Sequence, residues 1–132
     1  MSHTSSMEVS VQESDFEALE AACHDLGVEF VRGQTQFKQY YRKAHCDHAI
    51  RVPGNEQAFE IGLVKQDDGS YDLQSDYFGG SRGLEAKVGP EGQGLKQALA
   101  RQKDIRYWQT RGFRVTQDQK TENGHIVLKL TR

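Results

Sequence analysis

A pair of alternating apolar segments joined by a turn constrains the fold of this 132-residue chain more than any other feature. Apolar side chains recur at alternate positions over residues 59–63 and again over 71–77, and Asp67-Asp68-Gly69-Ser70 between them is typical of a tight turn. Side chains alternate between the two faces of a strand, so this pattern predicts two antiparallel strands with one buried face.

Shorter segments predict further strands. Residues 7–11 alternate in the same way, and 28–31 and 49–52 are short apolar runs. Near the end of the chain, 113–117 and 126–130 flank Asn123-Gly124, which predicts a second hairpin.

Two segments have apolar residues at helical spacing, 15–26 and 95–111. Gly27 and Gly112 follow them, where a left-handed residue would end each helix. The order of elements is then strand, helix, several strands, helix and two strands. We predict an α+β fold, an antiparallel sheet with both helices on one face, broadly ferredoxin-like.

Residues 79–94 contain six glycines and one proline, which predicts an irregular glycine-rich loop. The segment lacks the P-loop pattern, because the lysine comes one position late and no hydroxyl residue follows it. We therefore expect no cofactor and no catalytic residues from this loop.

Length and composition are those of one domain, so residues 1–132 are expected to form a single globular unit. No stretch approaches the roughly 20 apolar residues that span a bilayer. Two cysteines, Cys23 and Cys46, are too few for a disulfide framework. We expect a soluble, cytoplasmic protein with no membrane partner.

Charge is distributed unevenly along the chain. Residues 1–29 carry seven acidic and no basic side chains, whereas 95–114 carry six basic and one acidic. Basic and aromatic residues of the helix 95–111 make nucleic-acid binding an alternative function. We favour a solvated helix face that pairs with the acidic first helix or hairpin.

The sequence His45-Cys46-Asp47-His48 is the most chemically suggestive cluster. In one extended strand, His45 and Asp47 would share one face and Cys46 and His48 the other, so the four could not converge on one metal. A structural zinc site also needs four ligands, usually as two spaced pairs. We favour a structural role, and a metal or thiol site using Cys46, His48 and His45 remains an alternative.

Several short motifs resemble a known family. They are Met1-Ser2-His3, the helix start Asp15-Phe16-Glu17-Ala18-Leu19 ending in Leu26-Gly27, Tyr71-Asp72-Leu73 leading to Asp76-Tyr77-Phe78-Gly79, and Gly112-Phe113-Arg114-Val115. Together they resemble the domain-of-unknown-function family that contains hypothetical chloroplast reading frame thirty-five, with similar proteins in plastids, cyanobacteria, other bacteria and phages. The resemblance implies no catalytic residues, and it implies an accessory or adaptor role beside an AAA-type ATPase.

The leading functional hypothesis is a non-enzymatic interaction or adaptor module with a protein partner, for which the AAA-type ATPase is one candidate. Exposed aromatic and charged residues would form the binding surface; we expect Tyr40, Tyr41, Tyr77, Phe78, Trp108, Arg106 and Arg111. An exposed strand edge in so small a sheet also makes a homodimer reasonable.

Overall fold

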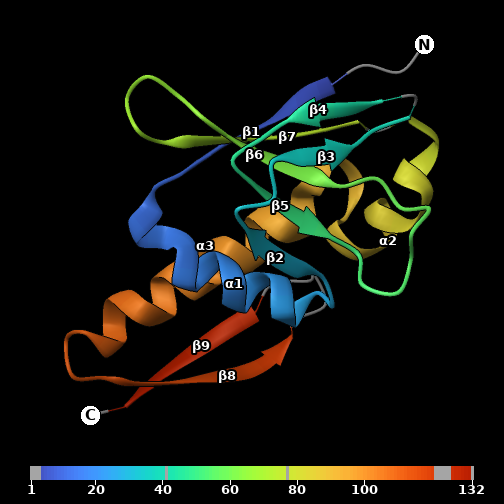
Figure 1. Ribbon diagram of the computed structural model, residues 1–132. Helices are drawn as coiled ribbons and strands as arrows, with labels where there is room; N and C mark the ends of the chain where they lie inside the picture. The colour runs from blue at the N-terminus through green and yellow to red at the C-terminus, as the bar shows by residue number, and fades with distance from the viewer. Residues whose placement is uncertain (1–3, 41, 77, 121–125, 132) are drawn as a thin grey trace.

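The computed structural model describes residues 4–40, 42–76, 78–120 and 126–131, and of 78–80, 117–120 and 126–128 only the backbone (Figure 1). The strands are β1 (Thr4–Val11), β2 (Glu29–Arg32), β3 (Gln36–Lys38), β4 (Lys43–His45), β5 (His48–Arg51), β6 (Ile61–Lys65), β7 (Tyr71–Asp76), β8 (Arg114–Lys120) and β9 (Ile126–Thr131). The helices are α1 (Phe16–Asp25), α2 (Leu84–Val88) and α3 (Gln93–Gln109), with 3₁₀ turns η1 (Glu13–Asp15), η2 (Phe78–Gly83) and η3 (Pro90–Gly92).

A five-stranded sheet with the order β1-β7-β6-β5-β2 forms the centre of the molecule, and every neighbouring pair in it is antiparallel. The β6–β7 hairpin, the strongest prediction from the sequence, lies in the middle of this sheet. Helix α1 carries the chain from β1 at one edge to β2 at the other (Figure 1). The predicted α+β class with an antiparallel sheet is confirmed, and the finer ferredoxin-like description stays a prediction.

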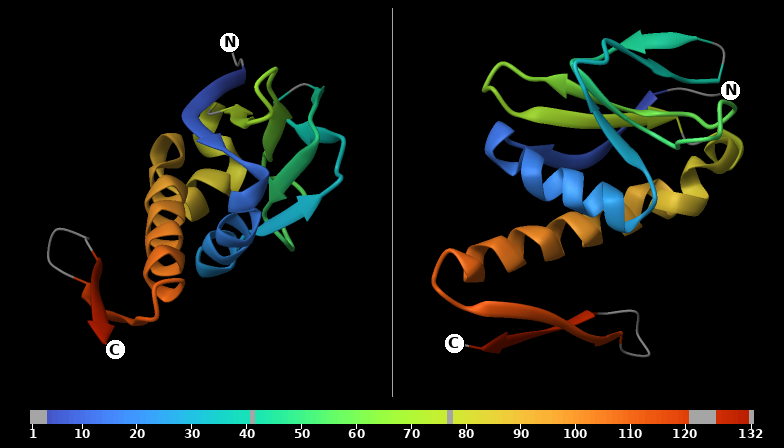
Figure 2. Two further views of the ribbon diagram at one scale, coloured as in Figure 1. Left: turned by 90° about the vertical axis from the view of Figure 1, so that its left-hand side faces the viewer. Right: turned by 60° about the horizontal axis from the view of Figure 1, so that its bottom comes forward.

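The helices pack on one face of the sheet, as predicted (Figure 2). Leu19 of α1 and Leu95 of α3 are almost completely buried there, together with Ile61 and Leu73 of the central strands. Burying each such side chain stabilises the fold by about 1.5–3 kcal/mol. This layer is the main hydrophobic core.

The opposite face of the sheet is covered by β3 and β4, a small antiparallel sheet that the sequence did not reveal. Phe37 of β3 packs there with Cys46 and Ala49, and all three are fully buried. Ala49 and Ile50 are consecutive in β5 but belong to the two different cores, because successive side chains of a strand point to opposite faces.

Phe37 lies directly over Gly62 of β6. A Cβ atom at position 62 would lie 2.2 Å from Cδ1 of Phe37, far inside van der Waals contact. The absence of a side chain at Gly62 therefore makes room for the phenyl ring, which is the close approach that glycine in a strand permits.

The prediction of an irregular loop over residues 79–94 is wrong in most of its length, because most of η2, all of α2 and η3, and the start of α3 lie in it. Leu84 and Val88 of α2 are buried in the main core. They are four residues apart, so one turn of helix places both on the same face. The glycines hide this short apolar pattern in the sequence.

No helix in the described part of the chain is long and apolar enough to cross a membrane.

Replacing Gly62 with alanine is expected to lower the free energy of unfolding by about 1–3 kcal/mol, because the new methyl group overpacks the site against Phe37. Urea unfolding of the single variants and of Gly62→Ala/Phe37→Leu measures the coupling. The smaller leucine should reduce the penalty of Gly62→Ala. Additive effects of the two substitutions would contradict the contact.

Candidate functional site

Helix α3 has two different faces. Leu95, Ala98 and Leu99 are buried against the main core. Ala100, Asp104 and Tyr107 are exposed, and Trp108 beside Tyr107 is half-buried. The core-facing side explains why the segment folds as a helix, since burial of an apolar stripe stabilises it. The residues of the outer face do not take part in this burial.

The chain turns back after α3 and forms the β8–β9 hairpin. Gly112, with a φ of 85°, provides the left-handed residue of this turn, and its N–H donates to the carbonyl oxygen of Gln109 at 3.1 Å. Val115 pairs with Leu130 in the hairpin. The hairpin lies beside α3 and apart from the five-stranded sheet (Figure 2).

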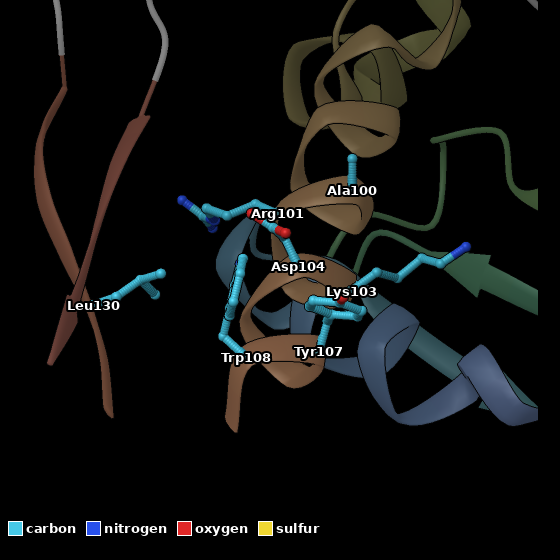
Figure 3. Close-up of a pocket in the computed structure, with 7 residues that line it drawn as sticks. All are labelled: Ala100, Arg101, Lys103, Asp104, Tyr107, Trp108 and Leu130. Atoms are coloured by element: carbon cyan, nitrogen blue, oxygen red, sulfur yellow. The ribbon is translucent and has the colours of Figure 1, made fainter. Parts of the chain in front are cut away.

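A groove of about 940 Å³ lies between α3 and the hairpin. Its lining residues are Ala100, Arg101, Lys103, Asp104, Tyr107, Trp108 and Leu130. Leu130 points from the hairpin toward α3, where Trp108 and Arg101 lie on the facing side (Figure 3). This volume is at the upper end of the range for small-molecule pockets, about 300–1,000 Å³.

The large hydrophobic residues that are exposed in the described part of the chain both line this groove. Tyr107 is 48% exposed and Leu130 is 36% exposed. Exposed aromatic and aliphatic side chains that lie together are typical of an interaction surface rather than of scattered surface residues.

Aromatic packing holds the end of the groove in place. The Trp108 ring meets Tyr107 at 5.1 Å and Phe113 at 5.3 Å between centroids, edge to face in both cases. The guanidinium carbon of Arg111 lies 3.6 Å from the centroid of Tyr107, a cation–π contact. These contacts restrict the rotamers of the groove residues, which lowers the entropy cost of binding.

Basic residues of α3, two of which also line the groove, contact α1 and the preceding turn η1, as the charge pattern predicted. Arg101 forms an ion pair with Asp25, and Lys103 forms one with Asp15 at 3.7 Å. Arg106 donates a hydrogen bond to the carbonyl oxygen of Glu17 at 3.1 Å. Much of the positive charge of α3 therefore serves the packing of α1 against α3.

The predicted interface residues do not form one surface. Trp108 and Arg111 lie at the groove, whereas Arg106 faces α1. The Tyr40 ring packs on Phe59, with the guanidinium of Arg82 over it at 5.3 Å. Tyr40 follows β3, and β3 lies far from the end of α3 in both views (Figures 1 and 2).

Three other predicted residues are not placed. Tyr41 and Tyr77 lie outside the described residues, and of Phe78 only the backbone is described, at the start of η2.

The structure adds Tyr107 and Leu130 to the candidate site. The signal for Tyr107 was its position beside Trp108, and for Leu130 the apolar alternation that ends β9. Nothing local distinguished these two residues from core residues, because their exposure depends on where the hairpin lies.

The cluster from His45 to His48 is not one extended strand. Strand β4 ends at His45 and β5 begins at His48, so the chain changes direction between them. The expectation that Cys46 and His48 share a face is therefore wrong. Cys46 is in the small core, where its thiol donates to the carbonyl oxygen of Gln34 at 3.2 Å. His48 instead contacts Phe16 of α1 on the helix face.

The remaining two residues of the cluster have separate positions. The side chain of His45 is 74% exposed, with its Nε2 3.9 Å from Asp47 Oδ1. Asp47 Oδ2 accepts a hydrogen bond from the backbone N–H of Lys65 at 2.8 Å. In the described part of the chain, no three His, Cys, Asp or Glu side chains are arranged to hold a metal ion.

His48 links the edge strand β2 to the aromatic part of the core. Its Nδ1 accepts a hydrogen bond from the backbone N–H of Gly33 at 2.9 Å. The ring lies 5.0 Å from Phe16 and 5.3 Å from Tyr71 between centroids. Burial lowers the pKa of His48, and Arg32 lowers it further, while Asp47 and Glu13 act in the opposite direction.

Both cysteines are expected to react slowly with an alkylating reagent in the folded protein. Burial raises the pKa of Cys46 to about 11 and that of Cys23 to about 12, so little reactive thiolate exists at neutral pH. Mass spectrometry after timed alkylation, with the urea-unfolded protein as the control, measures both rates. Rapid modification of Cys46 alone would favour the thiol site.

Acid is expected to weaken the fold through His48. Since its folded-state pKa lies below the ordinary value of 6.5, the unfolded chain binds the proton more readily. The contribution of His48 is complete above that pH and is lost progressively as the pH falls below it. Urea unfolding at about pH 8 and about pH 5 measures the difference.

The variant His48→Asn tests this assignment, because an asparagine oxygen accepts the Gly33 hydrogen bond without titrating. Its stability should depend less on pH than that of the wild type. His45→Asn, the same substitution at an exposed position of the same segment, is the matched control. Equal pH dependence in all three proteins would show that His48 is not responsible.

Comparison with known proteins gives one family. Residues 22–129 match the family model described as "Protein of unknown function (DUF1257)". No curated protein and no solved structure matches the chain. The match confirms the predicted domain-of-unknown-function family, whereas the plastid reading-frame name and the range of organisms stay predictions. It extends over most of the sequence, from within α1 to within β9. The chain therefore belongs to the DUF1257 family of proteins of unknown function.

Proposed function

We propose that this protein is a non-enzymatic protein-binding module, an adaptor in a larger complex, and that the groove between α3 and β9 is its binding surface. The observation that carries the proposal is the exposure of Tyr107 and Leu130 in that groove, beside Trp108. Tyrosine and tryptophan dominate the binding energy of protein interfaces, because they bury a large area with little loss of side-chain freedom.

The groove suits a protein segment that inserts apolar side chains between α3 and the hairpin. Trp108 and Leu130 provide apolar walls, and Arg101, Lys103 and Asp104 provide charged groups around them. This arrangement of an apolar centre with a polar rim is the general plan of a protein interface. The first partner to test is an AAA-type ATPase, the class that the family resemblance implies.

Nucleic-acid binding through the helix 95–111 has less support. Arg101 forms an ion pair with Asp25 of α1 and Lys103 forms one with Asp15 of η1, while Arg106 donates a hydrogen bond to the α1 backbone. Phosphates would have to compete with these contacts, so the helix offers less positive charge to nucleic acid than its sequence indicates. Neither function requires the protein to be cytoplasmic, and that location stays a prediction.

The variant Tyr107→Ala is expected to weaken partner binding at least about 10-fold, the effect of losing a strong interface residue. Tyr107 is 48% exposed, so the fold should tolerate the truncation. Gln109→Ala, at an exposed position of the same helix, is the matched control. The measurement is affinity capture from the native host with tagged protein, followed by titration of the purified ATPase or other recovered partner.

Two results would contradict the proposal. Recovery of no stoichiometric protein partner would reject the adaptor role. Equal binding by Tyr107→Ala and the wild type would reject the groove as its surface. Binding of single-stranded nucleic acid that falls steeply with salt and depends on Lys96 would instead favour the alternative.

A further inference from the structure

Unpaired strand edges are sites where another chain can add a strand, because their backbone N–H and C=O groups lack partners in the sheet. Within the described residues, β1 and β2 form the edges of the five-stranded sheet. The two-stranded sheets β3–β4 and β8–β9 have further open edges. These edges differ in how well they are protected.

Most of the edges carry features that prevent pairing. The pairing of β1 is interrupted between Ser6 and Ser10, where Glu8 has a φ of 57°. Strand β2 has four residues and exposes Glu29 and Arg32 at its ends. Strands β3 and β4 have three residues each. Bulges, edge charges and short strands are the usual protections against association.

Strand β9 has weaker protection: its pairing with β8 shifts register between Gln117 and Lys120, and Lys129 is its one charged residue. Its sequence, Ile126-Val127-Leu128-Lys129-Leu130-Thr131, is six residues long and contains one charge. Its neighbour β8 has the polar sequence Arg-Val-Thr-Gln-Asp-Gln-Lys. Apart from β8, no strand in the described part of the chain pairs with β9. A long, apolar and open edge is the feature that favours strand addition.

The hairpin also gains from additional strands. A two-stranded sheet is marginally stable in water, whereas three or more strands with an apolar face are stable. Leu130 in β9 remains 36% exposed despite the neighbouring α3. Extending the sheet would cover part of this apolar surface.

We propose that β9 pairs antiparallel with β9 of a second copy of this chain, joining the two hairpins into one four-stranded sheet across a twofold axis. A strand that pairs with itself is compatible with twofold symmetry only when it runs antiparallel. The outer edge of β9 is thus a self-association surface. This proposal does not rest on the adaptor function, because it concerns the purified protein alone.

The sequence of β9 selects the register. Centring the pair on Leu128 places Leu130 opposite Ile126 of the second copy, so apolar residues meet on one face. It places Lys129 opposite Val127, and the two ammonium groups stay apart. Centring on Lys129 instead would set the two lysines directly against each other, which is unfavourable.

Charge substitution at Val127 tests the register. Val127→Lys places a lysine opposite Lys129 at two symmetric positions and should raise the dimer dissociation constant roughly 2- to 30-fold. The double variant Val127→Lys/Lys129→Glu replaces both repulsions with attractions and should restore the dimer. Ser10→Lys adds the same charge at the exposed edge β1 and should have no effect. Sedimentation equilibrium measures each constant.

Cross-linking tests the geometry independently. In the proposed register the two copies of residue 128 face each other at a Cα separation of about 4.5–5.5 Å, within reach of a disulfide. The two copies of residue 131 lie about 20 Å apart. Oxidation should therefore link Leu128→Cys, and not Thr131→Cys, into a covalent dimer. The native cysteines are buried and should not contribute.

The outcomes separate the alternatives. A dimer that Val127→Lys weakens, that the double variant restores and that Leu128→Cys captures supports the proposal. A monomer at the highest soluble concentration overturns it, as does a dimer that Ser10→Lys weakens and Val127→Lys does not. Far-UV circular dichroism on each variant confirms that the chain remains folded. None of these results depends on whether Tyr107 binds a partner.

Discussion

The central sheet has apolar side chains on both faces, and both must be covered for it to exist in water. Helices cover one face around Ile50 and Leu63, and the small β3–β4 sheet covers the other around Ala49. The packing of the β3–β4 sheet depends on the contact of Phe37 with Gly62, where a side chain would not fit. Much of the local chemistry, including the burial of Cys46, follows from this arrangement.

Ion pairs join α3 to the N-terminal part of the chain. Its ion pairs with Asp15 of η1 and Asp25 of α1 neutralise positive charge that the sequence appeared to offer to a ligand. Arg101 and Lys103 also line the groove, where Tyr107 and Trp108 lie beside the C-terminal hairpin. The candidate binding surface therefore combines exposed aromatic residues with basic residues that already have acidic partners.

Much of the fold was predictable, and the candidate site was less so. The β6–β7 and β8–β9 hairpins and the helices α1 and α3 follow from alternation, turn residues and helical spacing, which are local properties. Strands β3 and β4 were missed because three residues are too few to show a period. Helix α2 was missed because its two core residues, Leu84 and Val88, stand in a glycine-rich segment.

The sequence alone determined the α+β class, the order of the main elements and the charge complementarity of the two long helices, because these depend on neighbours along the chain. Only the tertiary structure decided which polar and aromatic residues serve function and which serve packing. His48 and Cys46 are two positions apart, yet they enter different cores because the chain turns between β4 and β5. Tyr107 and Leu130 meet at one groove because a hairpin folds back beside α3, and burial depends on such contacts between distant segments.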